Sequence, residues 1–348
     1  MKYLLTLTMI VAYFISHSQN WTGAVSSDWS NSANWSAPPM NGAAVTIDPA
    51  NYTGGGHHPT ISSNSTFTVS TMQVVNGAVL TIGANLTTTS NVGVANADSE
   101  IIVNAGTFSV NFTGNGRLTA DLGGKITVNG GNIKIGQRLI SGQDALIVIN
   151  GGAVTTNQRL LMDLGGKIIL NNGVVNVGTL MALADGSAVN SSYFEQNGGT
   201  ITITGETSLE CETGDFEPTI LINGGTFTLN GDLTWFGDAP GSGKPVFRST
   251  GGLININGNI TNLPLSTVNV HLVIESNSQF NFNGTTIDLI YSADLVEQKG
   301  NSTFNLAGNT VWNHEGVFNA FDGVTSFNGP INFSGSGVVN IYNNTSAY

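Results

Sequence analysis

The residues best suited to chemistry in this chain are three arginines that recur in one register. Each stands in an Arg-Leu pair, twelve residues before an asparagine that opens a turn, and aspartates follow close behind. The set consists of Arg117, Arg138 and Arg159 with Asp121, Asp144 and Asp163. Guanidinium groups bind carboxylates, either those of neighbouring aspartates or those of a ligand. The pattern therefore admits a charge-paired structural ladder or a groove for an anionic polysaccharide.

A second candidate is Trp235, which with Phe236 precedes Gly237-Asp238 and is expected on a loop. An exposed indole can stack on a sugar ring, so Trp235 is the best single candidate for a ligand-stacking residue. An acidic stretch surrounds the only cysteine, Cys211, and is expected to be a solvated insertion; calcium is the alternative, although no liganding spacing is recognisable. Its acidic members are Glu206, Glu210, Glu212, Asp215 and Glu217.

Other chemical signatures are weak. His57 and His58 are adjacent, and adjacent side chains on an extended segment point to opposite faces, which is poor for binding one metal ion. The sequence contains neither a HExxH zinc motif nor a GxSxG nucleophile elbow. Threonines in two successive copies of the repeat described below fit a flat ice-binding face, but neighbouring copies break that row.

These candidates must be positioned by an internal repeat of 21 to 28 residues. The unit is a pair of alternating apolar residues, an Asn-Gly or Gly-Gly turn, and a second such pair, as in residues 126–135 and 220–229. The turn opens at Asn76, Asn104, Asn129, Asn150, Asn171, Asn197, Asn223, Thr250 and Ser276. Alternation after each turn means that one strand face is buried and the other meets solvent.

A repeat of this length predicts one coil of a parallel β-helix per copy, built from two or three short strands and their turns. We expect an all-β, right-handed parallel β-helix of about ten coils over residues 61–348. Its buried column is expected to run from Leu80 through Phe108 to Phe304. Glycine and asparagine are expected in turns that need positive φ, with asparagine side chains hydrogen-bonded along the rod.

The N-terminus and the composition bear on location and partners. Residues 1–18 match a secretory signal peptide, because Lys2 precedes an apolar stretch, 4–15, that is too short to span a membrane. No later segment is apolar enough to span one. Charged residues make up 9% of the chain, and the net charge is −12, which argues against nucleic acid as a partner. We expect a protein that is secreted or held at the outer cell surface.

Residues 19–60 are expected to form a cap, because a solenoid exposes an apolar end and Trp21, Trp29 and Trp35 can cover it. The stretch reads W-x-G, then D-W-S-N, then A-N-W-S and Pro, then a strand ending at Asp48. This pattern resembles the start of exported bacterial repeat β-helix proteins, namely autotransporter passengers and Bacteroidetes surface adhesins. The resemblance implies a surface or secreted scaffold.

The leading hypothesis is therefore a non-enzymatic, adhesin-like scaffold that contacts a polysaccharide or another cell-surface component. The alternative is a polysaccharide lyase or glycoside hydrolase acting on an acidic polysaccharide. Similarity to pectate-lyase-like β-helices would imply an arginine base, Arg138 or Arg159, beside calcium held by aspartates. Calcium is the cofactor that this alternative admits.

Overall fold

The computed structural model describes residues 19–341, apart from 38–41, 63–66, 185–189, 212–216, 238–243, 263–268, 290–293, 316, 321–323, 329–331 and 335–337. The proposed signal peptide, residues 1–18, lies outside the described residues. Within them, no helix has the length and apolar character needed to cross a membrane. The helical elements described are two short 3₁₀ turns, η1 (Ser32–Asn34) and η2 (Pro49–Asn51).

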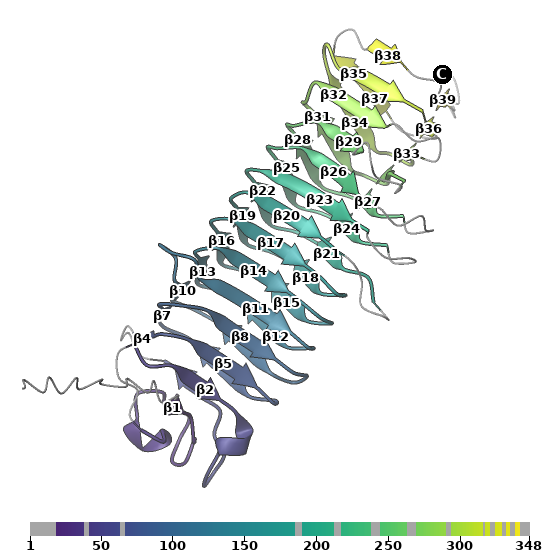
Figure 1. The fold of residues 1–348 in the computed structure, drawn as a ribbon. Coiled ribbons are helices and arrows are strands. Elements are labelled where there is room, and N and C mark those ends of the chain that lie inside the picture. The colour runs from purple at the N-terminus through teal and green to yellow at the C-terminus, as the bar shows by residue number, and fades with distance from the viewer. Residues whose placement is uncertain are drawn as a thin grey trace, which may run out of the picture.

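Three parallel sheets stack the coils of a solenoid of about eleven turns (Figure 1). Each full coil contributes one strand to each sheet, and consecutive strands of a sheet are therefore separated by a whole coil of chain. The predicted fold class, an all-β parallel β-helix, is confirmed.

The strands of each sheet follow one another in stacking order along the rod. The 14-stranded sheet contains β1 (Gln19–Asn20), β2 (Val45–Ile47), β5 (Met72–Val75), β8 (Val92–Ala95), β11 (Arg117–Asp121), β14 (Arg138–Ser141), β17 (Arg159–Met162), β20 (Leu180–Leu183), β23 (Glu206–Glu210), β26 (Leu233–Phe236), β29 (Ile260–Asn262), β32 (Thr286–Leu289), β35 (Val311–His314) and β38 (Asn332–Ser334). The 13-stranded sheet contains β3 (Thr60–Ile61), β6 (Val79–Ile82), β9 (Glu100–Val103), β12 (Lys125–Val128), β15 (Leu146–Ile149), β18 (Lys167–Leu170), β21 (Tyr193–Gln196), β24 (Thr219–Ile222), β27 (Val246–Ser249), β30 (His271–Ile274), β33 (Leu295–Gln298), β36 (Val317–Ala320) and β39 (Val338–Ile341). The 12-stranded sheet contains β4 (Phe67–Val69), β7 (Leu86–Thr88), β10 (Thr107–Val110), β13 (Asn132–Ile135), β16 (Ala153–Thr156), β19 (Val174–Val177), β22 (Thr200–Ile203), β25 (Thr226–Leu229), β28 (Leu253–Ile256), β31 (Gln279–Phe282), β34 (Thr303–Ala307) and β37 (Val324–Asn328).

The 12-stranded sheet holds the columns that the repeat predicts. Phe108 pairs with Ile133 on the next coil, and both side chains are buried. One copy is placed wrongly by the sequence pattern, because Leu80 lies in β6 of the 13-stranded sheet, where it pairs with Ile101. The true neighbour of Phe108 is Leu86 of β7. The turn before β7 lacks an Asn-Gly or Gly-Gly pair. The repeat pattern therefore does not identify β7 as a copy.

The predicted asparagine ladder is confirmed in the turns that lead into the 12-stranded sheet. Asn129 donates from Nδ2 to Oδ1 of Asn104 at 2.9 Å, and the same bond recurs from coil to coil until Thr250 donates to Asn223 at 2.7 Å. The intervening members are Asn150, Asn171 and Asn197. None of the six ladder asparagines has a positive φ, so side-chain bonding, not backbone conformation, accounts for them.

Glycines meet two separate needs. The second glycine of the Asn-Gly-Gly turns has positive φ, as at Gly131 (71°) and Gly225 (77°), which confirms one part of the prediction. A different set lies in the turns that lead into the 14-stranded sheet, where a Cβ on Gly205 would overlap the carbonyl oxygen of Thr179 on the coil before. In that set, close approach of successive backbones excludes a side chain.

The tryptophan-rich segment packs at the N-terminal end of the rod. Trp21, Trp29 and Trp35 are buried, and the rings of Trp29 and Trp35 lie edge to face with centroids 4.6 Å apart. Trp29 also contacts Phe67 of β4. Because β2 already pairs with β5 and β3 with β6, the expected boundary between cap and coils at residue 60 falls inside the first coil.

The imidazole of His58 joins the cap to the first coils. Its Nδ1 accepts a hydrogen bond from the backbone N–H of Val79 at 3.1 Å and lies 3.0 Å from the hydroxyl of Tyr52. Burial lowers the pKa of His58 below its usual value of 6.5, and burial with the charge of Asp48 raises the pKa of Tyr52 to about 12. The lowered value means that the unfolded chain binds more protons than the folded chain in the interval between the two pKa values.

We therefore expect the stability of the cap to decrease as pH falls below 6.5 and to level off below the folded pKa of His58. Urea unfolding at a series of pH values, followed by tryptophan fluorescence, measures the effect. His58→Gln should remove the part of the pH dependence that lies in this interval, and His57→Gln should retain it. A profile that is the same in wild type and His58→Gln would contradict the assignment.

Candidate functional site

The three arginines lie on neighbouring coils of the 14-stranded sheet, as the sequence predicts. Arg117 opens β11, Arg138 opens β14 and Arg159 opens β17, and the register pairs each with the next. Because neighbouring strands are about 4.8 Å apart, the three residues form a close row of like charges, the arginine row. Arg117 and Arg159 are exposed, and Arg138 is half-buried between them.

The aspartates stand at the opposite edge of the same face. Asp121 ends β11 four residues after Arg117, so both side chains leave the same side of the strand but start roughly 13 Å apart. Asp163 directly follows β17, and Gly142 takes the corresponding place after β14. Within the part of the chain that the structure describes, no ion pair joins the arginine row to a carboxylate. The predicted charge-paired ladder is therefore wrong for this row.

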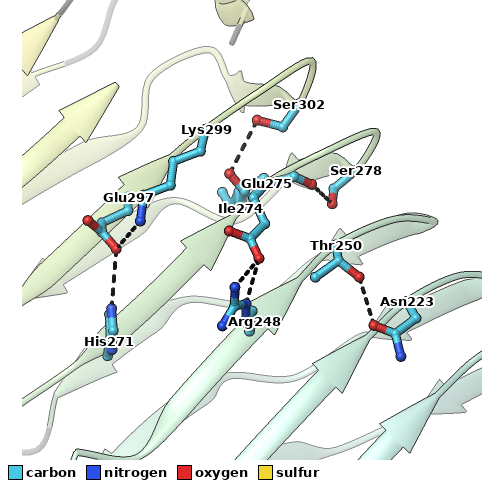
Figure 2. A network of polar contacts seen from close by, with 10 residues as sticks. All are labelled: Asn223, Arg248, Thr250, His271, Ile274, Glu275, Ser278, Glu297, Lys299 and Ser302. Carbon is cyan, nitrogen blue, oxygen red and sulfur yellow. Dashed lines mark hydrogen bonds and ion pairs between the residues drawn. The ribbon is translucent and has the colours of Figure 1, made fainter. Parts of the chain in front are cut away.

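Charge pairs between coils do occur on the 13-stranded sheet and in its adjoining turns, as Figure 2 shows. Arg248 is ion-paired with Glu275, and its Nε donates to that carboxylate at 2.6 Å. Glu297 lies 2.9 Å from Nζ of Lys299 and 3.5 Å from Nε2 of His271. Burial acts to raise the pKa of Glu297, but the hydrogen bonds and charges of Lys299 and His271 outweigh it and hold that pKa below its usual value. Among the residues that the structure describes, the arginine row has no comparable neutralising partner.

Arg138 has the least favourable surroundings in the row. Its Nε is enclosed and has no hydrogen-bond partner among the described residues, whereas Nε of Arg117 donates to Oε1 of Gln137 at 2.6 Å. Burial first, and then the charges of Arg159 and Arg117, lower the pKa of Arg138, although a guanidinium stays protonated at neutral pH. A bound anion would offset the mutual repulsion of the three guanidinium groups, so an anion is the ligand that this row favours.

A third column runs between the arginine row and the aspartates. Thr119 pairs with Ile140, and Ile140 with Leu161, in the middle of the three strands. All three are half-buried and alternate with the core residues, so they face outward. The outer face of β11, β14 and β17 thus has a cationic edge, a mostly apolar centre and an edge that carries Asp121 and Asp163.

An open groove of about 310 Å³ continues this face toward the N-terminus, over β5, β8 and β11. Gly93 lies at its centre, because the register places it between Gln73 and Thr119. The outward column therefore has no side chain on that coil. The polar side chains along the groove are those of Gln73, Asn91, Arg117, Thr119 and Asp121. Sequence reasoning missed the groove; the available signal was a glycine at an outward strand position.

Among the described residues, the aspartates are not gathered as a calcium site requires. Oδ1 of Asp121 accepts from the backbone N–H groups of Leu122 at 2.9 Å and Gln143 at 2.8 Å. Oδ1 of Asp144 accepts from Nδ2 of Asn190 at 2.8 Å. Over the described ranges of the chain, no group of three or more His, Cys, Asp or Glu side chains is placed to hold a metal ion.

Trp235 is a core residue, and the expectation that it lies on an exposed loop is wrong. It belongs to β26, its side chain is 0% exposed, and Nε1 donates to the carbonyl oxygen of Pro245 at 3.2 Å. The error arises because β26 continues the sheet by pairing with β23, so inward packing decides the position of the indole.

The acidic stretch around Cys211 is only partly an insertion. Glu206 and Glu210 lie within β23, and Cys211 is buried. Glu212 and Asp215 lie outside the described residues.

Comparison of the chain with protein-family models, with curated proteins and with solved structures finds no match. The function is therefore inferred from the face formed by β5, β8, β11, β14 and β17.

Proposed function

We propose that this protein is a non-enzymatic, adhesin-like scaffold, secreted or held at the outer cell surface, that binds an acidic polysaccharide along the arginine row. The observation that carries the proposal is the stacking of Arg117, Arg138 and Arg159 on successive coils with no carboxylate partner among the described residues. A row of guanidinium groups at a regular spacing matches a polymer that carries anions at regular intervals. The match of residues 1–18 to a secretory signal peptide supports the location.

Binding of an acidic oligosaccharide tests the proposal directly. Arg138→Ala is expected to raise the dissociation constant for alginate oligosaccharides about tenfold, since a charge-assisted hydrogen bond contributes about 1.5–3 kcal/mol and 1.4 kcal/mol is one factor of ten. Replacement of all three arginines should abolish measurable binding. Isothermal titration calorimetry at low and high salt measures both effects, because exposed ionic contacts weaken as salt is added.

Arg248→Ala is the matched control. It removes one positive charge from another face, where Glu275 already neutralises it, and should leave the dissociation constant within about twofold of wild type. Equal losses in Arg138→Ala and Arg248→Ala would mean that net charge alone governs binding and would count against the site.

The same samples test the enzymatic alternative. A lyase would release unsaturated products from an acidic polysaccharide in the presence of calcium, and their absorbance would rise with time. Turnover that is abolished in Arg138→Ala would overturn the scaffold proposal in favour of catalysis.

A further inference from the structure

We infer that the groove and the arginine row form one extended site that selects a carboxylated polysaccharide with free hydroxyl groups over a sulfated one, with Asp121 as a selecting residue. This inference rests on the proposed function and adds which class of polyanion the face accepts. The site has a cationic edge, a central column and an acidic edge, and each imposes a separate chemical requirement on the ligand.

The cationic edge requires an anion on one side of each sugar unit. Guanidinium groups stand on three successive coils about 4.8 Å apart. A ligand that lies along the rod would present its acidic groups to Arg117, Arg138 and Arg159 in turn. This edge alone accepts carboxylate and sulfate equally, because a guanidinium donates to both.

The central column favours a sugar ring with an apolar face. Ile140 and Leu161 face outward without polar atoms in their side chains, and they lie directly beside the arginine row. Gly93, which has no side chain, lines the groove, and the side-chain amide of Gln73 lies over it. A volume of about 310 Å³ is at the lower end of the range of ligand sites, about 300–1,000 Å³, which suits a short portion of a sugar chain.

The acidic edge separates the two classes of polyanion. Oδ1 of Asp121 is occupied by the N–H groups of Leu122 and Gln143, but the structure gives Oδ2 no partner among the described residues, and the side chain lines the groove. An ionised carboxylate only accepts hydrogen bonds. It can therefore accept from a sugar hydroxyl, whereas a sulfate offers no donor and would be repelled.

The acidic edge does not carry a carboxylate on every coil, so its requirement for a hydroxyl differs from one sugar unit to the next. Asp121 and Asp163 are two coils apart, with Gly142 between them. A sugar unit opposite Asp121 needs a free hydroxyl, while the unit opposite Gly142 is unconstrained at that edge. A densely sulfated chain would place a negative charge opposite Asp121 where the inference requires a hydroxyl donor.

The test compares two polyanions on the same variants of the full chain. Asp121→Asn retains an oxygen for the N–H groups of Leu122 and Gln143 but removes the charge. We expect its affinity for alginate oligosaccharides to fall about five- to tenfold, because a charge-assisted hydrogen bond is weakened. Its affinity for dextran sulfate oligosaccharides should rise about threefold, because a repulsion is removed. Isothermal titration calorimetry measures both.

Asp288→Asn is the matched control, since Asp288 lies on the same sheet in β32, paired with Thr261 and distant from the row. It should change neither affinity by more than about twofold. A rise in both affinities in Asp121→Asn would overturn the inference, because Asp121 would then act only through its charge. Absence of any arginine-dependent binding would instead refute the proposed function itself.

Sedimentation velocity of the unliganded protein completes the test. A monomer, in wild type and variants alike, supports a face that is open to ligand. A dimer that dissociates in Arg138→Ala would show that the arginine row is covered by a second copy, and it would overturn the inference.

Discussion

Trp235→Ala is expected to lower the free energy of unfolding by about 3–5 kcal/mol, the usual cost of truncating a buried aromatic side chain. The indole is fully enclosed, and the register places Leu209 of β23 and Asn262 of β29 on either side of it. A cavity at this position would therefore border three successive coils. Urea unfolding followed by far-ultraviolet circular dichroism measures the loss.

Trp235→Phe is the informative partner of this variant. Phenylalanine keeps much of the apolar volume but cannot donate to the carbonyl oxygen of Pro245, so its loss should be clearly smaller than that of the alanine variant. Folded Trp235→Ala protein should bind alginate oligosaccharides like wild type. Unchanged stability combined with lost binding would contradict the core position of the indole.

The second large effect is expected at Gly205. Its absent Cβ leaves room for the carbonyl oxygen of Thr179 on the preceding coil, and a methyl group there would overlap that oxygen. The obstacle is backbone and not a flexible side chain, so relief requires two coils to move apart. We expect Gly205→Ala to cost about 3 kcal/mol in unfolding free energy, the upper part of the usual range for overpacking.

Gly77→Ala is the control that separates the cost of atomic overlap, expected at Gly205, from the cost of a strained backbone conformation. Gly77 has a φ of 85°, but the nearest atom to its added Cβ would be Cβ of Asp98 at 3.9 Å. Only the left-handed conformation is penalised there, at about 1–2 kcal/mol. Equal losses at Gly77 and Gly205 in urea unfolding would show that close packing of coils is not what excludes a side chain at Gly205.

The stacking of the coils could be predicted because the same apolar alternation and turn recur in successive copies of the repeat. The alternation around Phe108 and Ile133 defines which face is buried, and the repeat period places equivalent residues above one another. The register of Arg117, Arg138 and Arg159 follows from the same period. Leu80 was misplaced because its turn resembles the repeated one in sequence while leading into another sheet.

The partners within the site could not be predicted in the same way. A repeat period specifies which coil a residue belongs to, but not which residues share a strand edge. Arg117 and Asp121 belong to one strand and stand at its two ends, so their charges remain apart. Trp235 precedes Phe236-Gly237-Asp238, which resembles a loop in sequence, and only the pairing of β26 with β23 shows that it turns inward. The groove depends on Gly93 lying between two longer side chains, which is a relation across coils.

The asparagine ladder has a direction. Each amide from Asn129 to Asn223 donates toward the N-terminal end and leaves its own oxygen for the coil that follows. Each completed coil thus serves as a template that offers acceptors to its successor, and chains of such bonds polarise one another. With Trp29 and its neighbours closing the first coil, a chain that emerges N-terminus first can add coils in order, without waiting for its C-terminal part.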